Sequence, residues 1–165
     1  MEQKYSIAEL IERIDQNWPE VSGVEGDIAL SLIRLHDLGL EKAKKVFDSY
    51  DLSHAEFEVL FTLRSLPLPR ELTPTELYKS ILITSGGMTK VLKSLEKRGL
   101  IERLDNVVDK RSKLVKLTQS GQDIIESSMA VLHQSDKEFF GGMLKPEELE
   151  QLNGLLQKAL KSLEK

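Results

Sequence analysis

The spacing of apolar and polar residues predicts a chain made mostly of helices. An amphipathic stretch over residues 6–16 ends at Trp18-Pro19, because proline disfavours helix at the residue before it. A much longer helix is predicted from Val24 to Tyr50. Its apolar positions recur with a helical period, at Ile28, Leu32, Leu35, Ala43, Val46 and Tyr50. Ser53 and Glu56 then form a capping box that starts another helix, which runs through Arg64.

Two short helices and two strands are predicted next. The sequence Thr73-Pro74-Thr75-Glu76 is a capping box with proline at the first helical position, and its helix runs to about Ser80. A second helix, with Thr84 as its N-cap, ends at Gly99. Its predicted buried residues are Met88, either Val91 or Leu92, and Leu95. Residues 100–104 and 113–117 have the pattern of strands and are joined by a polar connection, which completes a winged helix.

Two further helices are predicted after the wing. One covers about 118–140, Gly141-Gly142 closes it, and the last begins at Pro146. The last helix carries apolar residues at coiled-coil spacing: Leu149, Leu152, Leu156, Ala159 and Leu163. Such a seam must pack on another helix, either in this chain or in a second copy, and the spacing leaves both open. The predicted fold class is mainly α with a small β-hairpin (α+β), a winged helix-turn-helix between long terminal helices.

Composition narrows the class of protein. The chain has 165 residues, of which 40% are apolar and 30% charged, as in soluble globular proteins. The absence of cysteine excludes disulfides and thiolate zinc sites. No apolar run approaches the roughly 18 residues of a membrane span, and the charged N-terminus is unlike a signal peptide, so we expect a cytoplasmic protein. Phosphate-binding loops, nucleophile motifs and spaced metal ligands are missing from the sequence, so we expect no enzyme, no cofactor and no metal.

Charge is distributed unevenly along the chain. Between Thr73 and Thr118 there are ten Lys/Arg and five Asp/Glu, a charge of +5, although the whole chain has −4. The remainder, with thirteen Lys/Arg and twenty-two Asp/Glu, therefore has −9. A basic segment in an acidic protein can place a positive surface against phosphate, although charged runs are often only solvated faces.

Gly86 and Gly87 lie in the predicted first turn of the second short helix, where glycine is a poor helix former. One interpretation is a loose helix start. The other is that the backbone must approach a large partner closely, since a helix N-terminus offers free N–H groups to phosphate. Thr89, Lys90 and Lys93 project from the same helix, and Lys97 lies a turn further on.

The block from 73 to 121 reads TPTELYKSILITSGGMTKVLKSLEKRGLIERLDNVVDKRSKLVKLTQSG. Its wing carries D-x-R, then V-x-L-T and a nearby glycine, at Asp109, Arg111, Val115, Leu117, Thr118 and Gly121. With DLSHAEFEVLFTLR before it, the block resembles the multiple-antibiotic-resistance regulator (MarR) family of bacterial transcription factors. The resemblance extends over nearly the whole chain from residue 24. Asn106-Val107-Val108 departs from the family, which often has proline and more charge there, so the shape of the wing is left open.

The resemblance implies a homodimer that binds a pseudo-palindromic site in double-stranded DNA, with half-sites about one helical turn apart. Residues 1–50 and 119–165 would then form the dimer and 51–118 the DNA-binding lobe. Arg111 would enter the minor groove while Asp109 holds it, although the pair also fits an ordinary surface ion pair. The expected DNA-contacting residues are Thr75, Thr84, Ser85, Gly86, Gly87, Thr89, Lys90, Lys93, Lys97, Asp109 and Arg111.

The resemblance also implies a ligand. The lack of cysteine argues against peroxide sensing, and the chain is most similar to the branch that answers phenolic or aromatic acids and drugs. Ligands of the family enter a cleft between the dimer helices and the lobe. His36 lies about 40° from Leu32 in the apolar stripe, where it would either contact such a ligand or be a core histidine. Trp18 would either line the cleft or simply pack. Repression with ligand-induced release is the family default, and a protein–protein module that has lost DNA binding is the alternative.

Overall fold

A computed structural model describes residues 6–81, 87–107, 109 and 111–163. Contacts divide the chain into two compact units, Met1–Lys42 and Ala43–Lys165. The division by role into 1–50, 51–118 and 119–165 stays a prediction. The helices are α1 (Ile7–Asn17), the 3-10 turn η1 (Pro19–Val21), α2 (Val24–Ser49), α3 (His54–Ser65), α4 (Pro74–Ser80), α5 (Met88–Lys97), α6 (Gln119–Gly141) and α7 (Pro146–Leu163).

The first unit contains α1, η1 and most of α2. Ser6 and Glu9 form the capping box that starts α1, and the Ser22 hydroxyl donates to Asp15 to hold the turn after it. No residue of α1 is buried. The apolar stripe of α2 in this unit is largely exposed in the protomer, at Val24, Ile28, Leu32 and Ile33.

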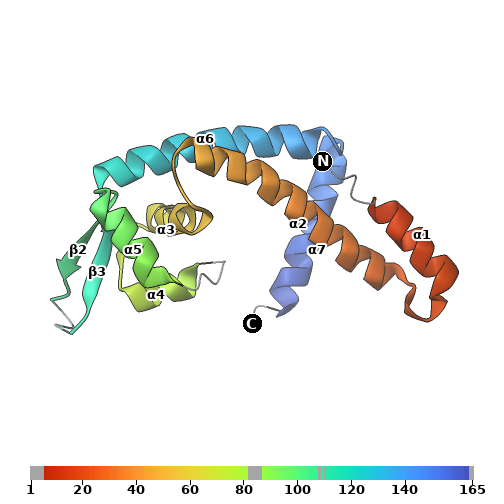
Figure 1. The fold of residues 1–165 in the computed structure, drawn as a ribbon, viewed down its shortest axis with the longest axis horizontal. Helices are drawn as coiled ribbons and strands as arrows, with labels where there is room; N and C mark the ends of the chain where they lie inside the picture. The colour runs from red at the N-terminus through yellow and green to blue at the C-terminus, as the bar shows by residue number, and fades with distance from the viewer. Residues whose placement is uncertain (1–5, 82–86, 108, 110, 164–165) are drawn as a thin grey trace. The chain divides into compact units, whose positions relative to one another are not determined.

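The second unit has one hydrophobic core, and α3 lies at its centre. Phe57, Leu60 and Leu63 of α3 are buried there. The predicted α3 capping box of Ser53 and Glu56 is confirmed, as is that of Thr73 and Glu76 at α4. The rest of the core comes from every neighbouring element and includes Phe47, Leu77, Leu92, Leu95, Ile101, Val115, Leu117 and Ile125. Helices α4 and α5 both contact α3, and the hairpin of β2 (Ile101–Asp105) and β3 (Lys113–Leu117) lies beyond α5 (Figure 1).

The sheet of the described chain has three antiparallel strands in the order β1-β3-β2. The predicted hairpin is confirmed as β2 (Ile101–Asp105) and β3 (Lys113–Leu117), with Arg103 opposite Val115. The third strand, β1 (Glu71–Leu72), was not predicted, because two residues are too few to show a strand period. Its pairing with β3 joins the start of α4 to the wing. The fold class is therefore as predicted, with one additional short strand.

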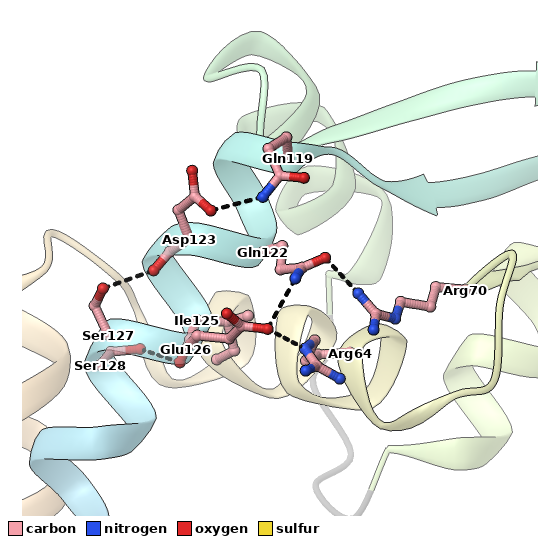
Figure 2. A network of polar contacts seen from close by, with 9 residues as sticks. All are labelled: Arg64, Arg70, Gln119, Gln122, Asp123, Ile125, Glu126, Ser127 and Ser128. Atoms are coloured by element: carbon pink, nitrogen blue, oxygen red, sulfur yellow. Dashed lines mark hydrogen bonds and ion pairs between the residues drawn. The ribbon is translucent and has the colours of Figure 1, made fainter.

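A polar network attaches α6 to α3 and to the connection before β1 (Figure 2). Arg64 Nε donates to Glu126 Oε1 at 2.6 Å, and Gln122 Nε2 donates to the same oxygen at 2.9 Å. Arg70 completes the network by donating to Gln122 Oε1. The hydrogen bond from Arg64 is the main cause of a lowered pKa for Glu126. Arg70 also has a left-handed backbone (φ 60°), and its carbonyl accepts from Leu117 at 3.4 Å, so this connection is fixed from two sides.

The C-terminal helix α7 begins at Pro146 as predicted, and none of its residues is buried. Its exposed leucines in the protomer are Leu155, Leu156, Leu160 and Leu163. Leu149 and Leu152 of the predicted seam are half-buried and α7 contacts α6, so the apolar side of α7 is only partly covered within the described chain. In the part of the chain that the structure describes, no helix has the length and apolar character needed to span a membrane.

Candidate nucleic-acid interface

Helix α5 separates its apolar and polar residues onto two faces. Leu92 and Leu95 are buried in the core, and this resolves the open choice between Val91 and Leu92 in favour of Leu92. The predicted DNA-contacting residues on this helix are all exposed: Thr89, Lys90, Lys93 and Lys97. The fold therefore presents one hydroxyl and three ammonium groups together on the open face of α5. Such groups contact phosphates and the edges of bases.

The start of α5 differs from the prediction. Its N-cap is Gly87 and the helix begins at Met88, so the predicted N-cap at Thr84 is wrong. Gly87 has φ 117°, a left-handed conformation that side chains rarely adopt, whereas nothing lies within 4 Å of the position a Cβ would occupy. Position 87 therefore favours glycine because of its backbone conformation, and not because neighbouring atoms of the chain leave no room for a side chain. Thr84, Ser85 and Gly86, three of the predicted contact residues, lie outside the described residues.

Helix α4 completes the helix-turn-helix. Leu77 is fully buried and anchors α4 to the core, while Thr75 lies exposed in the first turn. Thr73 caps the helix, because its hydroxyl accepts from the Glu76 N–H at 3.2 Å. The structure thus places Thr75 on the solvent side of the helix that precedes α5 in the chain.

The wing turn is held by short polar side chains. Asp109 Oδ1 accepts from the Arg111 backbone N–H at 3.0 Å and lies 3.5 Å from Arg111 Nε. Asn106 Oδ1 accepts from the Asp109 N–H at 3.1 Å, and Asn106 Nδ2 donates to the Ser112 hydroxyl at 2.9 Å. The Arg111 side chain is 95% exposed. Asn106, where the sequence departs from the family, therefore acts as a turn residue, as asparagine commonly does.

Comparison with known proteins agrees with this geometry. The MarR family model matches residues 52–113, which extend from two residues before α3 to the first residue of β3. An uncharacterized HTH-type transcriptional regulator of Bacillus cereus is 31% identical over 138 residues, 84% of this chain and 90% of that protein. The multiple antibiotic resistance protein MarR of Escherichia coli is 33% identical over 135 residues, 79% of this chain and 92% of that protein. The chain belongs to the MarR family.

Members of the MarR family are transcriptional regulators, and this chain is one. A crystal structure of a mutant of Escherichia coli MarR complexed with operator DNA superposes with a TM-score of 0.63. It is 32% identical, and the match covers 84% of this chain and 99% of that one. The likeness to a DNA-bound family member supports DNA binding by this chain, whose winged helix is complete from β1 to β3 apart from the undescribed positions.

Glu56 is a functional candidate in this MarR-family lobe that the sequence showed only as a helix cap. It is buried at 8% exposure. Burial opposes ionisation of its carboxyl, yet the pKa is lowered overall by the Ser53 backbone N–H, the Ser94 and Ser53 hydroxyls and the Arg98 charge. The carboxylate therefore stays ionised inside the lobe, in contact with α5.

The two predicted ligand-binding residues lie in the first unit of the chain. Trp18 is 61% exposed at the end of α1. The His36 side chain is 69% exposed, with Nδ1 3.5 Å from Asp37 Oδ1. His36 is therefore not a core histidine of the protomer, because the stripe that contains it is itself open. The structure leaves both side chains accessible within this unit.

Proposed function

We propose that this MarR-family regulator is a repressor that binds a pseudo-palindromic operator as a homodimer and is released by a small aromatic or phenolic ligand. The observation that carries the proposal is the exposed set of Thr89, Lys90, Lys93 and Lys97 on α5, whose opposite face is fixed in the core. Helix α5 would enter the major groove with its N-terminus first, where free N–H groups favour phosphate.

The wing supports the same proposal. Arg111 is fully available for the minor groove, whose negative potential attracts arginine. Asp109 bonds to the Arg111 backbone, so it would hold the arginine at the end of the turn. Contact by both the major-groove helix and the wing would give each protomer two points of attachment to one half-site.

A homodimer is supported by the apolar surface at both ends of the chain. The stripe of α2 from Val24 to Ile33 and the leucines of α7 are exposed in the protomer. Exposed apolar residues that recur along one helix often mark an interface, and a second copy would cover them. The ligand part of the proposal is supported by the accessible indole and imidazole of Trp18 and His36, which suit an aromatic acid.

Fluorescence anisotropy on the DNA upstream of the protein's own gene tests the function. We expect specific binding with two chains per site, an affinity that falls steeply with salt, and release by salicylate or a related aromatic acid. Binding without release would remove the ligand from the proposal. Affinity no better than for random DNA, also after selection from a random pool, would reject operator binding and favour a protein–protein module.

Replacing Arg111 with alanine is expected to weaken operator binding at least about tenfold and to leave the fold intact. The fold should persist because the exposed Arg111–Asp109 ion pair contributes little to stability. Anisotropy and thermal melting measure the two effects. Lys161→Ala, which removes one positive charge from α7, is the control. An unchanged affinity of the folded Arg111→Ala variant would exclude this arginine from the interface.

A further inference from the structure

One carboxylate in the lobe bonds to two helices at once. Glu56 Oε2 accepts from both the backbone N–H and the hydroxyl of Ser53, each at 2.9 Å, which closes the capping box of α3. Its other oxygen, Oε1, accepts from the Ser94 hydroxyl at 2.7 Å and lies 3.6 Å from Arg98 Nη1. Ser94 belongs to α5, and Arg98 is its C-cap. The cap of α3 is thus also an anchor for α5.

A second bond holds the end of α5 to the same corner. Arg98 Nη1 donates to the backbone oxygen of Asp51 at 2.7 Å, in the turn between α2 and α3. Ser94 and Arg98 are four residues apart and therefore lie on one side of the helix. Both side chains are half-buried, whereas Lys90, Lys93 and Lys97 are exposed on the adjoining surface of the helix. These polar contacts attach α5 at two successive turns.

The polar contacts constrain α5 in a way that its apolar contacts cannot. Leu92 and Leu95 hold the helix against the core, but hydrophobic attraction has no direction and permits small rotations and slides. A hydrogen bond requires a short distance and a narrow angle. A buried carboxylate that loses its partners is strongly disfavoured, so rotation of α5 about its axis would be opposed by Glu56.

We infer that Glu56, through Ser94 and Arg98, is a positioning residue that sets the rotation of α5 and hence the aim of its DNA-contacting side chains. The inference rests on the proposed operator binding. It assigns sequence discrimination in part to a residue that does not touch DNA. Direct readout needs side chains held within about 0.5 Å of the geometry that bonds to their bases, whereas attraction to phosphate tolerates displacement.

Two variants separate positioning from capping. Ser94→Ala removes the bond to Oε1 and leaves the capping bonds of Oε2 in place, while Glu56→Gln removes the charge. Affinity is measured for an operator selected with the wild-type protein and for random duplex of equal length. We expect each variant to bind the operator about tenfold more weakly and random duplex less than about twofold more weakly. A loss of folded protein would instead lower both affinities equally.

The Glu56→Gln/Ser94→Ala double variant tests whether the two residues act together. Because both changes weaken the same hydrogen bond, between Glu56 and Ser94, the double variant should bind the operator within about twofold of the weaker single variant. Glu9→Gln is the matched control. It removes the corresponding carboxylate from the capping box of α1 and should change neither the operator affinity nor the affinity for random duplex. Additive losses, or an unchanged ratio of operator to random affinity in both single variants, would overturn the inference.

Hydrogen exchange provides a readout without DNA. Ser94→Ala should accelerate amide exchange in α5 more than in α4, and equal effects on both helices would contradict a specific hold on α5. If the wild-type protein had no preferred DNA site, the proposed function would be rejected, but the hold of Glu56 on α5 would not be. In that case the exchange result would still decide whether Glu56 holds α5.

Discussion

Replacing Lys90, Lys93 and Arg111 together with alanine is expected to weaken operator binding by at least about 100-fold and to reduce its dependence on salt. The three cations are exposed on α5 and the wing, and a homodimer would lose six of them. Each lysine–phosphate contact that is lost releases one counterion fewer, so the slope of log affinity against log salt should become shallower. Anisotropy titrations at several salt concentrations measure both effects.

The control for this variant removes the same charge elsewhere. Lys145, Lys158 and Lys161 are exposed lysines in or beside α7, so their joint replacement with alanine lowers the net charge equally. We expect it to change operator affinity by less than about threefold. If both triple variants lost the same affinity while keeping the oligomeric state of the wild type, binding would depend on net charge alone, and α5 and the wing would not be the interface.

Replacing Gly121 with alanine is expected to destabilise the protein by about 3 kcal/mol. A Cβ at this position would lie 2.0 Å from the Leu100 carbonyl oxygen and 2.9 Å from Leu117 Cδ1. The nearest atom belongs to the backbone, so it cannot move without displacing the end of α5 or the start of β2. Urea unfolding followed by circular dichroism measures the loss in the free energy of unfolding. In a thermal melt, the same loss should lower the melting temperature by about 6–12 °C.

Gly154→Ala is the matched control, because Gly154 lies in α7 and a Cβ there would meet nothing within 4 Å. Alanine is the better helix former, so we expect this variant to be unchanged or up to about 1 kcal/mol more stable. A Gly121→Ala variant that unfolds at the same urea concentration as Gly154→Ala would show that the junction tolerates a side chain.

The contacts of Gly121 give a physical reason for the motif of Leu117, Thr118 and Gly121 that is shared with the MarR family. Thr118 caps α6, because its hydroxyl accepts from the Gly121 N–H at 3.0 Å. The same hydroxyl donates to the Gly99 carbonyl at 2.7 Å, and the Thr118 N–H donates to Leu100 at 3.2 Å. The Leu117-Thr118-x-x-Gly121 sequence therefore joins β3, the end of α5 and the start of α6 at one point. Its role in this chain is structural, and it holds the wing beside α5.

Several elements were predictable from the sequence because their causes are local. A capping box joins residues three positions apart, so Ser53 with Glu56 and Thr73 with Glu76 predicted the starts of α3 and α4. The periodic leucines predicted α7, and the alternation of apolar and polar residues after residue 100 predicted the hairpin. The block from Thr73 to Gly121, together with the helix before it, indicated the family. The exposed positions of α5 were predictable because the helical period separates Lys90 and Lys93 from Leu92 and Leu95.

The tertiary structure decided the features whose partners are distant in the chain. Strand β1 exists because β3 pairs with it, and two residues alone have no strand preference. Helix α5 begins at Met88 because Gly87 adopts a left-handed backbone, a state that its neighbours in the sequence do not reveal. Glu56 meets Ser94 across 38 positions, and Arg70 meets Gln122 across 52. Propensity and periodicity act over a few residues, whereas these bonds depend on how the packed helices bring separate segments together, so only the folded chain specifies them.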